Sequence, residues 1–179
     1  MPVRLLLFFA IALLAGCASS EDKAMEEIKA KEASLYTSDT KNFKFDEKQA
    51  RETILVYENF AQKFPQSKQA PEMLLKSADL YRSLKDYDAA LNVYQKIAAE
   101  FPDFDKQAQV LFLQGFVYEN ELYRMEKAKG LYEKFLQLYP DHDLADDVQF
   151  SLQNLGKTPE EIIKGFEQQE TAPTDTGAS

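Results

Sequence analysis

The chain has 179 residues, enough for a domain with a hydrophobic core, and a composition typical of a globular protein. Its formal net charge is −9 and it has no basic stripe, so nucleic acid is not an expected partner. Its single cysteine excludes an intramolecular disulfide framework and any metal site with several cysteine ligands.

The chain begins with a short apolar run at residues 5–14 that follows a basic residue. This run has about half of the roughly 20 residues that a membrane-spanning helix needs. Residues 1–16 are therefore predicted to be a signal peptide.

The motif Leu14-Ala15-Gly16-Cys17 resembles the lipobox of bacterial lipoproteins, which is an aliphatic residue, two small residues and a cysteine. That resemblance implies cleavage between Gly16 and Cys17, a diacylglyceryl thioether on Cys17 and acylation of the new amino group. Two or more acyl chains give stable anchoring, at about 0.8 kcal/mol per buried methylene. Because Ala18 rather than aspartate follows Cys17, the resemblance favours the outer membrane. We expect the protein to face the periplasm, and the sequence leaves a cell-surface orientation open.

Residues 17–45 are interpreted as the lipidated N-terminus, a polar tether, a helix and a loop. The helix is expected at residues 21–36, with Ala24, Ile28 and Leu35 on one face. The pattern leaves open whether this helix completes an extra repeat or is only a stalk.

The central part of the chain is built on a nine-residue phrase that occurs three times, at Tyr57–Pro65, Tyr94–Pro102 and Tyr132–Pro140. The prolines lie 102 − 65 = 37 and 140 − 102 = 38 residues apart. A period in this range is typical of stacked supersecondary units, each too small to bury its apolar face alone.

Each phrase is predicted to end a helix at its proline. For the first of these helices, Asp46 is the expected N-cap. The side chain of Gln49 is expected to reach back to this N-cap residue, and Phe45 to pack on Ala50. The later helices are expected at residues 68–84, 86–101, 106–122 and 123–139. Small residues on their faces permit close approach of neighbouring helices: Ala78, Ala90, Gly115 and Ala128.

These positions resemble the tetratricopeptide repeat. The second-helix pattern of that family is matched by Ala90, Tyr94, Ile97 and Pro102, and again by Ala128, Tyr132, Phe135 and Pro140. Thr53 replaces the alanine of the first copy, and Leu74 and Leu111 replace the usual tryptophan. The resemblance covers residues 46–166 and implies an all-α fold of antiparallel helix pairs stacked as a short superhelix. This part of the chain is similar to the repeat modules of the outer-membrane β-barrel assembly lipoprotein and of a periplasmic cell-division coordinator.

Within a domain at residues 46–168, repeats are expected near residues 46–65, 66–102, 103–140 and 141–168. The last contains a helix near residues 143–155 that ends at Gly156. A capping box then starts a helix at residues 158–168, which we expect to cover the exposed end of the stack. Residues 169–179 are polar and expected to be disordered.

No group of residues has the pattern of a catalytic site, so we do not expect an enzyme and assign no cofactor. His142 lies between Asp141 and Asp143. A metal site there is possible in principle, but acidic residues at a helix start are favoured by the helix dipole alone. No metal ligand is assigned.

The resemblance also implies a binding surface, because the first helix of each tetratricopeptide pair lines a concave groove. The carboxylate clamp of the repeats that bind chaperone tails is not recognisable in this chain. An aromatic side chain in such a groove is an exposed anchor, which is the role expected for Phe116. Carrying over the matched positions places seven residues in the groove: Asp79, Arg82, Ser83, Phe116, Glu119, Asn120 and Asn154.

The leading functional hypothesis is a lipid-anchored scaffold that binds other proteins of the cell envelope through this groove, in outer-membrane or envelope assembly. The alternative is a structural module associated with the cell wall, which binds glycan or self-assembles.

Overall fold

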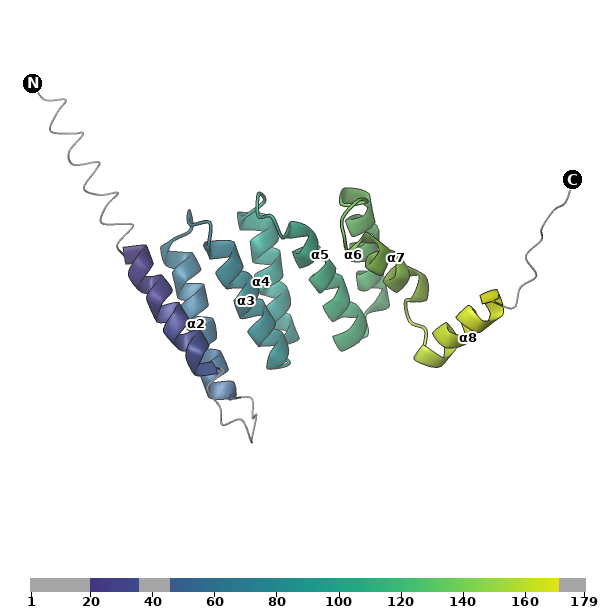
Figure 1. Cartoon of the computed structure of the whole chain (residues 1–179), viewed down its shortest axis with the longest axis horizontal. Coiled ribbons are helices and arrows are strands. Elements are labelled where there is room, and N and C mark those ends of the chain that lie inside the picture. Colours follow the sequence, from purple (N-terminus) through teal and green to yellow (C-terminus); the bar gives the residue numbers. More distant parts are fainter. Residues whose placement is uncertain (1–19, 36–45, 171–179) are drawn as a thin grey trace, which may run out of the picture. The chain divides into compact units, whose positions relative to one another are not determined.

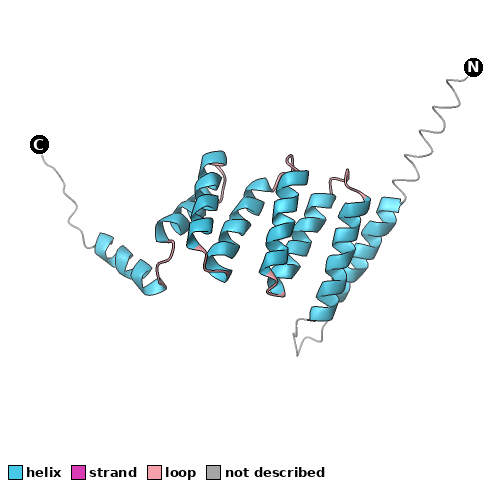
Figure 2. Cartoon of the chain, turned by 180° about the vertical axis from the view of Figure 1, so that it is seen from behind, coloured by secondary structure: helices cyan, strands magenta, loops and turns pink. Residues whose placement is uncertain are grey.

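A computed structural model describes residues 20–35 and 46–170, and the regular elements in these ranges are helices (Figure 1; Figure 2). The predicted all-α fold class is confirmed. The lipidation motif and the C-terminal residues 171–179 lie outside the described residues, so the predictions made for them stay predictions.

The chain divides into two compact units, Met1–Phe104 and Asp105–Ser179. The described helices of the first unit are one over residues 20–35, α2 (Glu47–Lys63), α3 (Ala70–Ser83) and α4 (Tyr87–Glu100). Those of the second unit are α5 (Gln107–Phe116), the π-helical turn η1 (Val117–Glu121), α6 (Met125–Leu138), α7 (Ala145–Asn154) and α8 (Pro159–Glu170). Helices that follow one another pack together within each unit, from α2 to α4 in the first and from α5 to α7 in the second.

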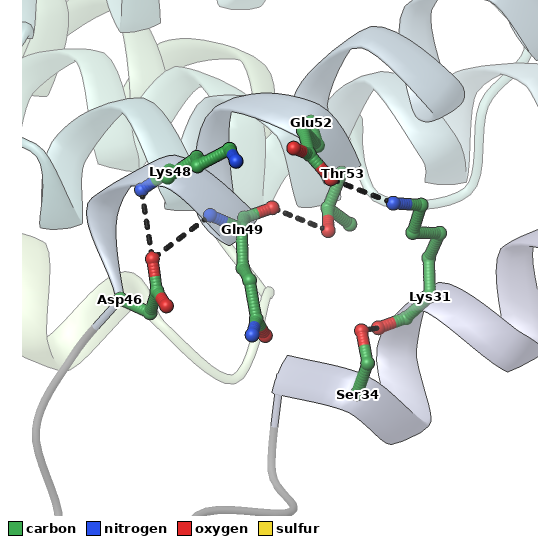
Figure 3. Close-up of polar contacts among 7 residues, drawn as sticks. All are labelled: Lys31, Ser34, Asp46, Lys48, Gln49, Glu52 and Thr53. Carbon is green, nitrogen blue, oxygen red and sulfur yellow. Dashed lines mark hydrogen bonds and ion pairs between the residues drawn. The ribbon is translucent and has the colours of Figure 1, made fainter.

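Two helices, α2 and α4, start at capping aspartates. A side-chain oxygen of Asp46 accepts hydrogen bonds from the backbone N–H groups of Lys48 at 3.0 Å and Gln49 at 3.1 Å (Figure 3). Asp86 caps α4 in the same way, at 3.3 Å. These bonds satisfy N–H groups that have no partner within the helix. The predicted cap at Asp46 is confirmed, whereas Phe45 lies outside the described residues.

The second helix of each pair, which is α2, α4 or α6, ends at the residue before the recurring proline. Phe64, Phe101 and Tyr139 are the C-caps of α2, α4 and α6, with φ angles of −124°, −129° and −134°. Proline disfavours the α conformation in the residue before it, so each helix stops there. After α7, Gly156 has a φ of 77°, a left-handed conformation that glycine adopts without strain.

The recurring apolar positions form the core of each unit. On α4 and on α6 the same three positions are fully buried, at 0% exposure: Ala90, Tyr94 and Ile97, then Ala128, Tyr132 and Phe135. Thr53, the residue that departs from the family pattern, is also buried, and its hydroxyl donates to the carbonyl of Gln49 at 2.8 Å. A threonine therefore fits the position of the alanine because its polar atom bonds to its own helix.

The helix over residues 20–35 belongs to the first unit and lies beside α2 (Figure 1). Its Ile28 is 1% exposed and packs in a cluster that includes Tyr57 and Phe60 of α2. The ammonium group of Lys31 binds the carboxylate of Glu52 at 2.8 Å (Figure 3). This helix therefore pairs with α2 inside the first unit, in the place that the first helix of a first repeat would take. The repeat boundary expected at residue 46 stays a prediction.

The direction of this helix follows from its polar contacts. Glu21, near its start, accepts a hydrogen bond from Ser67, just beyond the end of α2. Lys31, near its end, binds Glu52 in the first half of α2. The two helices are therefore antiparallel, as in the other pairs of the repeat.

The π-helical turn η1 accommodates one extra residue in the second unit. In the first unit the N–H of Asp86 donates to the carbonyl of Tyr81, five residues back, at 2.9 Å. The equivalent bond in the second unit runs from Arg124 to Tyr118, six residues back, at 2.7 Å. The same helix-ending bond thus closes a loop that is one residue longer, and the helix widens to hold it.

The numbering of the repeats agrees with this position for the insertion. Gly115 follows Ala78 by 115 − 78 = 37 residues, whereas Tyr123 follows Lys85 by 123 − 85 = 38 residues. Lys85 and Tyr123 are equivalent in conformation, with φ angles of 59° and 53°. The difference between the two periods therefore arises between residues 115 and 123, where η1 lies.

Deleting Asn120 is expected to leave the stability of the fold within about 1 kcal/mol of wild type, because the deletion restores the 37-residue spacing. Thermal unfolding followed by circular dichroism measures this. The matched control is deletion of Lys129, an exposed residue within α6. It rotates the buried face of a regular helix and should strongly destabilise the unit. Equal losses from the two deletions would contradict the assignment of the extra residue.

The last helix, α8, starts as predicted but does not fully bury its apolar side chains. Thr158 and Glu161 form the reciprocal capping box, with bonds of 2.8 and 3.2 Å. Ile163 and Phe166 are 58% and 54% exposed, and the ring of Phe166 stacks on Phe150 of α7. The expectation that this helix covers the end of the repeats is met only in part, because Ile162 is partly buried whereas Ile163 and Phe166 stay open to solvent.

Candidate functional site

The three groove residues predicted in the first unit lie together at the C-terminal half of α3. Asp79 and Ser83 are exposed, whereas the side chain of Arg82 is 25% exposed. Arg82 Nη1 lies 3.5 Å from Asp79 Oδ1, and the Ser83 hydroxyl donates to the Asp79 carbonyl at 2.9 Å. The repeat spacing therefore places them on one accessible face.

A pocket of about 360 Å³ is hollowed into this part of the first unit. Its walls come from the helix over residues 20–35, from α2 and from α3. Seven residues line it: Glu32, Leu35, Tyr57, Lys76, Asp79, Leu80 and Ser83. Sequence reasoning found Asp79 and Ser83. It missed Glu32 and Leu35, because it left open whether their helix completes a repeat, and it did not predict that Tyr57, Lys76 and Leu80 line a pocket.

Glu32 is the best-bonded carboxylate of the pocket. It accepts hydrogen bonds from the Lys76 ammonium group at 2.7 Å and from the Tyr57 hydroxyl at 2.8 Å. Partial burial opposes ionisation of Glu32, but these two bonds and the charge of Lys76 outweigh it and lower the pKa of the carboxyl. Lys76 also lies 5.9 Å from the centre of the Tyr57 ring. The Glu32 side of the pocket is therefore a fixed ion pair.

Asp79 is held less tightly. The Tyr94 hydroxyl donates to Asp79 Oδ1 at 3.4 Å, and the Arg82 contact on the same oxygen is 3.5 Å long. Burial raises the pKa of Asp79, against the opposing effects of Arg82 and Tyr94. Both contacts are longer than the roughly 2.7–2.9 Å of strong charge-assisted bonds. This carboxylate therefore keeps the capacity to accept a further donor.

One polar contact recurs in all three repeats. The tyrosine that begins each nine-residue phrase donates its hydroxyl to a carboxylate on the first helix of its own repeat. The pairs are Tyr57 with Glu32 at 2.8 Å, Tyr94 with Asp79 at 3.4 Å, and Tyr132 with Glu119 at 2.6 Å. The acceptors stand at different positions of the repeat, because Glu119 corresponds in the repeat spacing to Arg82 and not to Asp79. In each repeat the buried tyrosine nevertheless bonds an acidic group of the first helix.

The groove residues predicted in the second unit have less capacity for binding. Glu119 is engaged by Tyr132. Asn120 and Asn154 each donate to the carbonyl four residues earlier in their own helix, at 3.2 and 2.9 Å. Phe116 is half-buried, with its ring 6.2 Å from that of Phe112. It is therefore not the fully exposed anchor that we expected.

The only histidine has a structural role. His142 Nδ1 accepts a hydrogen bond from the Leu144 N–H at 3.0 Å, and the ring lies edge-on to Phe135 at 5.7 Å. Within residues 20–35 and 46–170, the structure contains no group of three side chains arranged to hold a metal ion. In the same ranges, no helix has both the length and the apolar character needed to cross a bilayer.

Comparison with known families supports the interpretation of the helix pairs. The sequence pattern of the tetratricopeptide repeat matches residues 72–103 and 109–142, which contain most of α3 with α4, and α5 with α6. The predicted repeats are confirmed there. Tetratricopeptide repeats bind other proteins, so these helix pairs have the architecture of a protein-interaction scaffold. No curated protein matches the chain.

Glu32→Gln is expected to lower the melting temperature at neutral pH by about 2–4 °C, because it weakens the bonds to Lys76 and Tyr57. The pKa of Glu32 is lowered in the folded chain. Its stabilisation is therefore present above the pKa of the unfolded state and is lost as the pH falls through the folded-state pKa. Melting curves from neutral to acidic pH should show the gap between variant and wild type closing.

The exposed Glu100 at the end of α4 supplies the control for this measurement. Glu100→Gln makes the same chemical change without breaking an ion pair of the pocket. A gap between Glu32→Gln and wild type that stays constant with pH would contradict the role given to Glu32.

Proposed function

We propose that this chain is a lipid-anchored scaffold of a bacterial cell envelope that binds a segment of another protein on the first-helix face of its repeats. The observation that carries the proposal is the pocket of the first unit. It lies among the helix over residues 20–35, α2 and α3, and it contains Asp79 and Ser83, which the repeat pattern places in the groove. A pocket with apolar walls and a few polar groups is the usual form of a binding site.

The anchoring part of the proposal rests on Cys17. The lipobox resemblance implies acylation there, on a protein of the outer membrane that faces the periplasm. Only three peptide steps separate Cys17 from residue 20, where the described helix begins. Three residues reach at most about 11 Å, so lipidation would hold the first unit close to the bilayer surface. Partners in this setting are other envelope proteins, in outer-membrane or cell-envelope assembly.

Photocrosslinking in the native envelope tests the binding part. A photoreactive residue at position 83 probes the pocket, because Ser83 is exposed and lines it. The control probe replaces Gln95, which is exposed on α4. We expect a specific protein adduct from position 83 that is absent from position 95. The proposal fails if both positions give the same pattern of adducts, or none.

The anchoring part is tested separately with Cys17→Ser. Fractionation should find the wild-type chain in the membrane and the variant in the soluble fraction. Metabolic labelling with a fatty acid should mark only the wild type. Equal membrane association of both proteins without labelling would exclude lipidation at this cysteine.

One observation favours the alternative, self-assembly. The stacked rings of Phe150 and Phe166, 6.2 Å apart, are 45% and 54% exposed, and form an apolar surface at the C-terminal end of the second unit. Sedimentation velocity of the full chain in detergent tests this function. A concentration-dependent dimer that is lost in Phe166→Ala would support it.

A further inference from the structure

The pocket of the first unit has two chemically different ends. Leu35 and Leu80 and the ring of Tyr57 supply its apolar part. Its polar part has two carboxylates, Glu32 and Asp79, with a single ammonium group from Lys76 and the hydroxyl of Ser83. The lining itself has two carboxylates and one ammonium group, and Arg82, which does not line the pocket, lies 3.5 Å from Asp79. An occupant with one positive charge on an aliphatic chain matches both ends.

The ammonium group of Lys76 is already closely paired, whereas the carboxylate of Asp79 has only long contacts. Lys76 is held at 2.7 Å by Glu32 and lies over the Tyr57 ring. The contacts of Asp79, from Tyr94 and Arg82, are 3.4 and 3.5 Å long and both fall on Oδ1. The Asp79 side chain is also 52% exposed, so a donor can approach it from solvent. An acidic occupant would instead meet two carboxylates.

Resting on the proposed function, we infer that this pocket binds an arginine or lysine side chain of the partner polypeptide. The Asp79 carboxylate accepts hydrogen bonds from the incoming cation, and the methylene groups of that side chain pack on Leu35 and Leu80. The Ser83 hydroxyl donates to the backbone of its own helix and keeps an acceptor lone pair for the same cation. The pocket therefore selects partners by a basic residue and gives the helix over residues 20–35 a direct part in recognition.

The pocket has enough room for one long side chain of a partner. About 360 Å³ lies near the lower end of the roughly 300–1,000 Å³ of small-ligand sites. A long aliphatic stem with a charged head fits such a pocket better than a bulky ring system, because the stem covers the leucines while the head stays at the polar rim. Arginine has the further advantage of a planar, forked donor that binds a carboxylate through two bonds.

The test is a selection of random nonapeptides on the full chain, immobilised in detergent. Sequencing of the selected pool is expected to show arginine or lysine enriched at one position. The bait Asp79→Asn, which keeps the shape of the side chain but removes its charge, should lose this enrichment and bind the selected peptides about tenfold more weakly. The control bait Glu100→Gln, which removes an exposed charge from α4, should retain it.

A second variant distinguishes a blocked pocket from an unfolded bait. Ser83→Lys places a tethered ammonium group at the rim of the pocket and should block selection of basic peptides, while its circular dichroism and melting temperature stay those of wild type. A selected pool without basic enrichment would overturn the inference and leave the proposed peptide-binding function standing. If no peptide is selected above a bait-free control, the inference and the binding function both fail.

Discussion

Ile28→Ala is expected to lower the free energy of unfolding of the first unit by about 2–5 kcal/mol and to undock the helix over residues 20–35. Ile28 is 1% exposed and packs with Tyr57, Phe60, Phe64 and Met73. It is the only residue of this helix that is buried to this degree among residues 20–35. Removing its side chain leaves a cavity where the helix meets α2. The helix is then held mainly by part-buried polar contacts, such as those of Glu32 with Tyr57 and Lys76.

Chemical denaturation and hydrogen exchange measure this prediction. The amides of residues 20–35 should exchange much faster in Ile28→Ala, while those of α4 keep their protection. The control is Leu55→Ala, because Leu55 lies on α2 but is 59% exposed, and should change stability by less than about 0.5 kcal/mol. Similar losses in the two variants would show that the helix is not docked through Ile28.

The prediction also has a functional consequence. Glu32 and Leu35 belong to the same helix as Ile28 and form one wall of the pocket. A chain that has lost this wall should select peptides poorly even though Asp79 and Ser83 are unchanged. Stability and recognition are thus coupled in the first unit, because its first helix serves both.

The sequence predicted the helix ends well, because they depend on neighbouring residues. Capping by Asp46 and termination before the recurring prolines are local effects, and both were found where they were expected. The sequence left the role of the helix over residues 20–35 open, since this helix lacks the tyrosine phrase and residues 36–45 separate it from α2 in the chain. Ile28, buried on an otherwise charged helix, was the available clue.

The π-helical turn shows a different limit. The periods of 37 and 38 residues were visible in the sequence, but a difference of one residue does not say where the chain absorbs it. A longer loop between helices was an equal possibility. Only the bond from Arg124 to Tyr118, compared with that from Asp86 to Tyr81, places the extra residue at the end of a helix.

The candidate site was predicted only in part, for a related reason. Repeat offsets place Asp79 and Ser83 on the accessible face, because that depends on helical periodicity. They do not report contacts between helices, so the bonds of Glu32 to Lys76 and Tyr57 were not foreseen. The same repeat offset led us to expect too much exposure for Phe116, because the aromatic ring of Phe112 lies one helical turn away.

Gly115→Ala is expected to destabilise the second unit by about 1–3 kcal/mol, although alanine is the better helix former. A Cβ at this position would lie 2.5 Å from Tyr132 Cε1 and 2.8 Å from Cδ1. The Tyr132 ring cannot easily move aside, since it is 0% exposed and its hydroxyl is bonded to Glu119 at 2.6 Å. Thermal and chemical unfolding measure the loss.

Gly130→Ala gives the same chemical change in the same unit with the opposite expected sign. Apart from the adjacent backbone of its own helix and its chain neighbours, nothing lies within 4 Å of a Cβ built at Gly130 in α6, so alanine there should stabilise the unit by about 0.5–1 kcal/mol through helix propensity alone. Combining Gly115→Ala with Tyr132→Leu should destabilise less than the sum of the two single variants, because the shorter side chain makes room for the new methyl group. If Gly115→Ala stabilised like Gly130→Ala, or if the pair were strictly additive, α5 and α6 would not be in contact through this glycine. The close approach that lets Tyr132 reach Glu119 would then have another cause.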